Sequence, residues 1–572
     1  MNMKLYRIYL LFLSLIALSA HAQEFKKLAF TGAARGLYFG DHLYQNEIDS
    51  ITIPRTNNGH VLVDLGMNIR PNRQTEIQGM VRIRNDYGGF WGSGVSFDVR
   101  QLYIKGVAGG IVRYQLGDIN DKFTAFTLMN TNQEIQNESP EVFRQQTRLM
   151  NYDNFYSKDS TWRQQGASMN FALSFSKFIE EIQFHGMASR VRTTDFSNVS
   201  DRLFSGYQVH LIQSRNAELG YNHVNVFDLE GTSRNPVHYK NPVHTIDATL
   251  RGEFQQISAN LKSEAGVSQM TYENLAEAPT LKGKFINSKL DVNFKQFGLE
   301  VSAAWRYVNS DFRSAGAQTK RINYNYQPQA FARITNNQVV RTLGLMDLMR
   351  EQNAYNRQLS TTLMAFNPKY DNITPYGAAT PNRQGLDFQL KYNGLNKLLN
   401  VVVQQIYFTE TKGEGTVLPR KFMRSSFSAS MNLNELRKDK SKLFHISLAA
   451  RNDQTSRNGE GNVPEVNLNT QVISLGAEFE FLSKWDLLLG MQLVKYKGFD
   501  FMSVRNNYSE IYNFQEWNAN GQETMSSAGI RYRFSDKSDL SLNYGVFSNS
   551  DKLNLNQNYR INQFMLLYQM NF

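Results

Sequence analysis

The sequence predicts an all-β protein: a single antiparallel up-and-down β-barrel that crosses a membrane with about 22 strands, within a range of about 18 to 24. Three observations predict this fold. Apolar and polar side chains alternate over stretches of about ten residues, the connections between these stretches are alternately short and long, and the last stretch ends on an aromatic residue. A tilted strand needs about nine to eleven residues to cross a bilayer, whereas strands of globular sheets usually have about five or six.

The composition of the 572 residues excludes two other classes of protein. Hydrophobic residues make up 41% and charged residues 20%, and the mean hydropathy is -0.47. A helical membrane protein would need several runs of roughly 20 apolar residues, and only one such run is present, at the N-terminus. The 28 Tyr and 38 Phe, against 12 Pro, are equally unlike a disordered polar chain.

Residues 1–22 predict a cleaved N-terminal secretory signal peptide. Lys4 and Arg7 precede an apolar stretch from Leu10 to Ala20, and Ala22 completes a small-x-small cleavage site. Residues 23–572 would then form the barrel. The chain has no cysteine, so it has neither a disulfide framework nor a thiol to lipidate. Removing Lys4 and Arg7 lowers the formal charge from +11 by two, which is too mild a charge at this length to predict nucleic-acid binding.

Alternation with a period of two identifies the individual strands. Ile257, Ala259 and Leu261, for example, are separated by single polar residues. The same pattern predicts strands near 28–39, 60–70, 75–85, 95–105, 110–118, 162–177, 180–192, 202–212, 217–227, 243–254, 257–269, 282–294, 297–308, 385–393, 397–409, 422–433, 442–453, 468–481, 485–497, 524–534, 540–547 and 559–572.

The predicted connections fall into two classes that alternate along the chain. Short ones include 71–74, 213–216, 255–256, 295–296, 482–484 and 535–539, and long ones include 119–161, 229–242, 309–384 and 498–523. Short periplasmic turns at one rim and long extracellular loops at the other are typical of outer-membrane barrels. A secreted β-helix, propeller or pair of sandwiches would also have many strands, but the sequence has no repeat of about 20 to 50 residues.

The last predicted strand has one apolar face, which carries Phe564, Leu566, Tyr568, Met570 and the terminal Phe572. This tail resembles the C-terminal assembly signal of Gram-negative outer-membrane β-barrel proteins, the porin-like superfamily, without indicating a specific family within it. The resemblance implies a location in the cell outer membrane, with outer-membrane lipid and the barrel-assembly machinery as partners.

The sequence shows no constellation that would predict chemistry. It has no HExxH, no GxSxG, no Walker loop and no EF-hand loop, and the His residues after the signal are scattered singly. Some barrels that resemble this one are proteases or phospholipases, but no set of Asp, His, Ser and Asn is singled out here. We therefore expect no catalytic residue, no cofactor, no metal site and no enzymatic activity.

Six arginines are candidates for lining a pore. Two Arg-x-Arg pairs place two guanidiniums on the inward face of one strand, and single arginines on the next two strands share the inward parity of the first pair. The six are Arg82, Arg84, Arg100, Arg113, Arg531 and Arg533. A basic strip on a pore wall would favour anionic solutes. The alternative is a neutralised ladder of charges, because six carboxylates also face inward by parity: Glu76, Asp98, Glu264, Glu300, Glu478 and Glu480.

The longest predicted loop contains a break in the strand pattern. Over 338–353, the residues Val339, Leu343, Met346 and Met349 recur at spacings of three and four, which predicts a short amphipathic helix. Barrels of about 22 strands usually contain a plug. We therefore expect 309–384, helped by 119–161, to fold into the lumen, because an apolar stripe above the membrane would be exposed.

Two functions follow from this fold. The first is a porin-like channel that passes or binds small polar solutes. The second is a non-enzymatic subunit or scaffold of an outer-membrane secretion or surface-assembly complex, whose long loops bind an envelope protein. TonB-dependent receptors are similar in barrel size, but here a strand is predicted within about six residues of the cleavage site, which leaves no room for their N-terminal plug domain.

Overall fold

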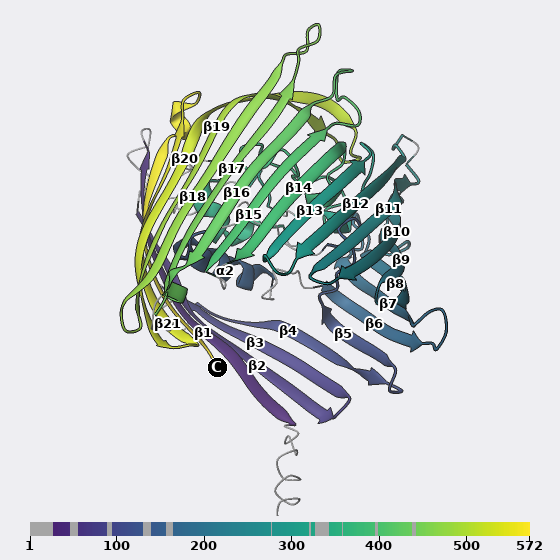
Figure 1. Cartoon of the computed structure of the whole chain (residues 1–572), viewed down its shortest axis with the longest axis horizontal. Coiled ribbons are helices and arrows are strands. Elements are labelled where there is room, and N and C mark those ends of the chain that lie inside the picture. The colour runs from purple at the N-terminus through teal and green to yellow at the C-terminus, as the bar shows by residue number, and fades with distance from the viewer. Residues whose placement is uncertain are drawn as a thin grey trace, which may run out of the picture.

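A computed structural model describes residues 27–45, 55–87, 94–129, 139–155, 164–275, 277–319, 322–326, 342–356, 359–394, 398–436 and 442–572. The predicted signal peptide and Val339 lie outside these residues. The described part of the chain forms one sheet of 22 strands, in which each strand pairs with the next in antiparallel orientation and β22 pairs with β1 (Figure 1). The predicted fold class and strand number are confirmed.

The first half of the sheet consists of β1 (Leu28–Gln45), β2 (Arg55–Asn72), β3 (Thr75–Asp86), β4 (Val95–Ala108), β5 (Val112–Ile119), β6 (Gln164–Ser174), β7 (Glu181–Arg192), β8 (Arg202–Ser214), β9 (Ala217–Asp228), β10 (His238–Phe254) and β11 (Ile257–Glu273). The second half consists of β12 (Leu281–Phe294), β13 (Leu299–Val308), β14 (Arg383–Gly394), β15 (Leu399–Thr409), β16 (Lys421–Asn432), β17 (Phe444–Arg457), β18 (Val466–Leu482), β19 (Trp485–Arg505), β20 (Ile511–Ser535), β21 (Ser538–Asp551) and β22 (Tyr559–Asn571).

The first and last strands close the barrel. Their ladder runs from Ala33 opposite Asn571 to Gln45 opposite Tyr559. Beyond it, Gly32 and Phe572 exchange two backbone hydrogen bonds of 2.9 and 3.0 Å. Closure pairs the backbone groups that an open sheet would leave at its edges, and a bilayer offers no water to satisfy such groups.

The outer face of the barrel is apolar. In β14, for example, Leu386, Phe388 and Leu390 are each about two-fifths exposed, while Asp387 and Gln389 between them face the lumen. The last strand follows the same rule, because Phe564, Leu566 and Phe572 are exposed on the outer face. Rows of exposed large apolar side chains around a closed sheet are stable only where lipid surrounds them.

The connections alternate in length as predicted, with one correction. Residues 498–523 are not a loop, because β19 and β20 continue as a hairpin and only 506–510 connect them. The sequence predicts a loop here because apolar and polar residues are mixed on both faces of the extension, so that the regular alternation stops where the strands leave the bilayer. Similarly, β10 begins at His238, which shortens the predicted 229–242 connection to 229–237.

Two α-helices and most of the 3₁₀ turns lie in the two longest connections. Helix α2 (Glu141–Phe155) follows β5. The connection after β13 contains α3 (Leu345–Arg350) and the 3₁₀ turns η1 (Ala315–Ala317), η2 (Gln352–Ala354) and η3 (Gly377–Ala379). The other two turns are η4 (Leu433–Leu436), after β16, and η5 (Leu555–Gln557), after β21. Helix α3 is shorter than the predicted 338–353, since Gly344 before it and Glu351 after it are extended. No helix in the described part of the chain is long and apolar enough to span a bilayer.

Candidate functional site

The lumen of the barrel is the candidate site, and helix α2 lies inside it (Figure 1). The first turn of α2 rests on a pair of glycines, Gly476 of β18 and Gly490 of β19, which are direct cross-strand partners. A Cβ atom on Gly490 would lie 2.6 Å from a methyl carbon of Val142, and one on Gly476 would lie 3.0 Å from Pro140. The two glycines therefore leave the space into which the helix packs.

Apolar side chains of both long connections pack beside this glycine pair. Val142 and Met150 of α2 share a buried cluster with Leu343 and Met346 of the α3 region. The wall side of this cluster consists of inward side chains of β18 to β22 and β1, namely Leu468, Val472, Leu488, Val494, Tyr496, Ala519, Met525, Phe547, Tyr559, Ile561 and Leu43. Met349 belongs to the same cluster and is 9% exposed.

The C-terminal end of α2 is held by charged side chains of β1 and β3. Asp153 accepts hydrogen bonds from Arg35 of β1 at 2.7 Å and from Arg82 of β3 at 3.0 Å. Arg82 also donates two bonds of 2.7 Å to Asp64. Although burial alone would raise the pKa of Asp153, the nearby Arg35 and Arg82 hold the pKa of this carboxyl below its usual range. The carboxylate form is therefore the one that the site stabilises.

The neighbouring residue Tyr152 adds to this anchor. Its hydroxyl donates to Asp64 at 2.5 Å, its ring lies 4.0 Å from the guanidinium of Arg100, and Arg100 donates to its backbone carbonyl. A β-bulge at Arg100 shifts the register between β3 and β4 and brings this guanidinium to the inner face. Burial raises the pKa of Tyr152 to about 12.

The near end of α2 carries a second ionic contact. Glu141 pairs with Arg148 of the same helix at 2.6 Å and with Arg531 of β20 at 3.4 Å. Arg531 is itself shared with Asp486 at 2.7 Å and with Glu478. Burial acts to raise the pKa of Glu141, but its bonds to arginine hold that pKa below the ordinary value. Ion pairs therefore hold both ends of α2 against the wall, the N-terminal end at β20 and the C-terminal end at β1 and β3.

The connection after β13 packs on two other parts of the wall. Phe126, from the connection before α2, stacks on Phe285 of β12 with ring centroids 3.9 Å apart, and Phe312 packs edge-on against both rings. Ile373 packs between Phe408 of β15 and Phe422 of β16. Both clusters face the lumen, so the described residues of this connection fill space inside the barrel.

Buried ion pairs tie the same connection to the strands. Lys369 bonds to Glu523 of β20 at 2.6 Å, and Asp371 bonds to Arg424 of β16 at 2.8 Å. All four side chains are buried. An ion pair of this kind mainly fixes geometry, because desolvation of the charges offsets most of their attraction. The contacts therefore set where the connection lies more than how stable the barrel is.

The β19–β20 hairpin crosses the mouth at the long-loop rim. Tyr508, in its connection, packs edge-on against Tyr272 of β11 with ring centroids 5.0 Å apart, and the Tyr272 hydroxyl donates to the Asn507 carbonyl at 2.8 Å. Arg505 of the hairpin bonds to Glu414 at 2.6 Å. In Figure 1 the yellow-green end of this hairpin arches over the top of the barrel.

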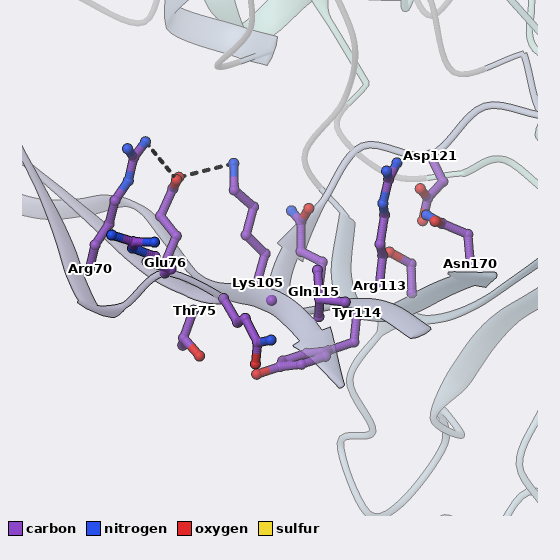
Figure 2. A pocket seen from close by; sticks show the side chains of 14 residues that line it. Arg70, Thr75, Glu76, Lys105, Arg113, Tyr114, Gln115, Asp121 and Asn170 are labelled. Atoms are coloured by element: carbon purple, nitrogen blue, oxygen red, sulfur yellow. Dashed lines mark hydrogen bonds and ion pairs between the residues drawn. The ribbon is translucent and has the colours of Figure 1, made fainter. Parts of the chain in front are cut away.

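One sector of the wall differs from the rest. The strands from β2 to β6 contribute a single residue, Ile119, to the buried apolar clusters of the described chain. At the short-turn rim this sector contains a pocket of about 560 Å³, lined by side chains of β2 to β6 (Figure 2). A volume of this size suits a small molecule.

The pocket is positively charged. Four cations line it, Arg70, Arg73, Lys105 and Arg113, against the two carboxylates Glu76 and Asp121. Glu76 pairs with Lys105 at 2.9 Å and with Arg70 at 3.1 Å. Arg113 has no carboxylate within 4.0 Å in the described chain. Figure 2 shows Arg70, Glu76, Lys105 and Arg113 rising from one side of the strands, while Tyr114 lies on the other.

Comparison with known proteins reaches only the fold. No protein-family model and no curated protein matches the chain. Among solved structures, OccK8 (OprE) of Pseudomonas aeruginosa is 8% identical with a TM-score of 0.35, over 96% of this chain and 99% of that one. The P pilus usher (PapC) translocation pore is 8% identical with a TM-score of 0.39, over 95% and 99%. A BenF-like porin of Pseudomonas fluorescens Pf-5 is 8% identical with a TM-score of 0.34, over 96% and 99%.

Three features of the structure itself identify the class of barrel. A closed antiparallel ladder, an apolar outer face, and short turns at one rim with longer loops at the other occur together. The chain is an outer-membrane-type β-barrel. In this outer-membrane-type barrel, the rim that carries Arg73 and the terminal Phe572 is the short-turn, periplasmic rim.

The six predicted arginines do not form one strip in this barrel. Arg82 and Arg100 are buried beneath the end of α2, and Arg84 bonds to Asp86 at 2.8 Å. On β20, Arg531 bonds to the three carboxylates of Glu141, Glu478 and Asp486, and Arg533 bonds to those of Glu480 and Asp486. Of the six, only Arg113 lines the pocket. The other five lie beside carboxylates that neutralise them, which is the alternative that parity in the sequence left open.

Sequence reasoning missed α2 and most of the pocket. The signal for α2 was present, because Pro140 and Glu141 are favourable in the first turn of a helix, and the Pro140 carbonyl accepts hydrogen bonds from the backbone of Phe143 and Arg144. Arg70 and Lys105 gave no comparable signal, since each is a single cation at a strand end. Among the described residues, no group of three or more His, Asp or Glu is placed to hold a metal ion.

Proposed function

We propose that this outer-membrane-type barrel is a porin-like channel of the Gram-negative outer membrane that passes or binds small polar solutes. The observation that carries the proposal is the polar sector from β2 to β6. Apolar clusters and buried ion pairs of the two long connections occupy much of the remaining wall. Within this sector the end of α2 covers Arg82 and Arg100, but toward the periplasmic rim the sector presents Gln115, Ser168 and Asn170 beside the cations of the pocket. Solute would pass along that polar wall.

The charge of the pocket supports a preference for anions. Two positive charges remain after its four cations are set against its two carboxylates. A cleft of one sign raises the local concentration of ions of the other sign. Arg113 would contact the solute in preference to Lys105 and Arg70, because Glu76 already binds those two cations. A small carboxylate or phosphate ester is the class of solute that fits this arrangement.

In this proposal the protein performs no covalent chemistry and needs no cofactor. Its partners are outer-membrane lipid, which covers the apolar outer face, and the barrel-assembly machinery, which would engage the apolar face of β22. The outward positions of Phe564, Leu566 and Phe572 support that role. Tyr568 and Met570 share their parity and are half-buried on the same face.

Purified barrel in a planar bilayer and in liposomes tests the proposal. We expect discrete conductance steps, and liposome swelling that is faster with a small organic anion than with a neutral solute of equal size. The scaffold function would instead give electrically silent barrels that co-purify with envelope proteins in fixed ratio. Silence in the bilayer together with no swelling for either solute would contradict the channel.

A further inference from the structure

A second hollow lies on the outer face of the barrel, on the opposite rim from the basic pocket. It has a volume of about 510 Å³ and is bounded by β13 to β17, which stand side by side in Figure 1. Its outward side chains include Trp305, Gln384, Tyr407, Lys421 and Gln454. The proposed solute route makes no use of this hollow, because these side chains face away from the lumen.

The hollow sits where the bilayer meets the extracellular side. Lys421 is the first residue of β16 and Gln384 the second of β14, while Trp305 lies three residues before the end of β13. Trp305 is 46% and Tyr407 51% exposed. Tryptophan and tyrosine collect at membrane interfaces, where one end of the ring is apolar and the other meets water.

The surface changes from apolar to polar across the hollow. Toward the bilayer centre the outward residues of the same strands are Leu386, Val403 and Phe427, all exposed. Toward the rim they are Gln384, Lys421 and the other amide and hydroxyl side chains of the hollow. An occupant must therefore be amphipathic, with its polar end at the rim and its apolar end along the strands.

The polar end of the hollow carries one positive charge. Lys421 is exposed and has no carboxylate within 4.0 Å in the described chain, unlike Lys240 of β10 and Lys391 of β14, which pair with Glu273 and Glu300. An unpaired ammonium is a ligand for phosphate. The amides of Gln384 and Gln454 offer hydrogen bonds to hydroxyl groups, and Gln384 already donates to Thr409 at 3.3 Å.

We propose that this hollow binds one phosphorylated glycolipid of the outer leaflet. Its phosphate would lie beside Lys421, its sugar hydroxyls beside Gln384 and Gln454, and an acyl chain along Trp305 and Tyr407. A lipid fits better than a protein because an apolar row continues below the hollow into the bilayer.

Native mass spectrometry of the delipidated full-length barrel tests this proposal. The probes are purified lipid A with its phosphates, the same lipid A after enzymatic dephosphorylation, and inorganic phosphate alone. We expect one phosphorylated lipid A to be retained per barrel, and Lys421→Ala to weaken its binding about fivefold, the loss typical of one cation near a lipid surface. Lys282→Ala is the matched control, because Lys282 is exposed near the same rim on β12 and lies outside the hollow.

Three results would overturn the proposal. They are equal retention of the dephosphorylated lipid, equal loss of binding in the Lys421 and Lys282 variants, and binding of inorganic phosphate with the affinity of the lipid. Trp305→Ala is a second arm, which should weaken lipid A binding without changing the net charge. Lys421 and Trp305 are both exposed, so neither substitution removes a buried side chain and both variants should give folded barrels.

Discussion

Tyr508 and Tyr272 face one another across the mouth of the barrel, with ring centroids 5.0 Å apart, although they belong to the β19–β20 connection and to β11. This contact is made by a hairpin whose strands continue beyond the bilayer and bend over the lumen. Aromatic pairs of this kind contribute about 0.5–1.5 kcal/mol each. An interaction of this strength can keep the hairpin over the lumen, yet thermal motion breaks it frequently.

Locking this contact should close the channel. The chain has no cysteine, so Tyr272→Cys with Tyr508→Cys can be bridged specifically by a reducible bifunctional thiol reagent. We expect bridged barrels to lose most of their conductance and to regain it on reduction, because solute must pass under the hairpin. Tyr508→Cys alone, treated with the same reagent, is the control. Full conductance in bridged barrels would mean that the hairpin does not cover the route.

Releasing one end of α2 should make the channel noisy. Asp153→Asn removes the charge that Arg35 and Arg82 hold, and should weaken the docking of this end by about 1.5–3 kcal/mol, the usual contribution of charge-assisted hydrogen bonds. We expect more frequent and larger current fluctuations in single-channel records. Asp86→Asn is the control, because Asp86 is half-exposed and its pair with Arg84 contributes little.

Acid should have the same effect as that substitution. The pKa values of Asp153 and Glu141 lie below their usual range in the folded barrel. Their contribution to docking is therefore complete above the ordinary carboxyl pKa of about 4 and is lost as the pH falls through the lower, folded value. Current noise should stay constant from pH 7 to about pH 5 and rise only below about pH 4. A rise between pH 7 and pH 6 would point to histidine instead.

Shortening the connection after β13 should widen the lumen. A Gly/Ser turn in place of residues 315–380 removes the contacts of Leu343, Met346 and Ile373 with the wall. We expect a larger, less regular conductance and greater sensitivity of cells to large antibiotics, with heat-modifiable mobility on a gel retained. Unchanged conductance would show that the connection does not restrict the route and would favour the scaffold function.

The last strand should decide whether the barrel assembles. Deleting residues 570–572 removes the two backbone bonds between Phe572 and Gly32 and shortens the β1–β22 ladder. We expect export without insertion, seen as loss of heat-modifiable mobility. Phe254→Ala is the control, since Phe254 is another outward aromatic, 71% exposed at the same rim. Normal insertion of the shortened chain would contradict the role of the tail.

The sequence predicted the strands well because lipid imposes a simple rule on them. Wherever one face must be apolar and the other wet, alternation over about ten residues marks the strand, as at Ile257, Ala259 and Leu261. The rule fails beyond the bilayer. The outer part of β19 and β20 mixes polar and apolar residues on both faces, so the sequence predicts a loop there.

The interior was harder to predict because it depends on long-range contacts. Parity correctly places Arg82 and Arg113 on the inner face, but parity says nothing of what covers them. Asp153, which covers Arg82, is 71 residues away along the chain, and no local pattern connects the two. Similarly, Gly476 and Gly490 make room for α2 only because the fold brings it there.

The zero-current potential in a salt gradient tests the central claim most directly, that small polar solutes pass along the β2–β6 sector. In a low-salt gradient, wild-type barrel should select anions, and Arg113→Ala should move the potential toward cation preference, with a shift that shrinks as the Debye length falls from about 10 Å at 0.1 M to about 3 Å at 1 M salt. Arg84→Ala, which removes a guanidinium already bonded to Asp86 outside the pocket, should leave the potential unchanged. Equal shifts in both variants, or none in either, would contradict this route.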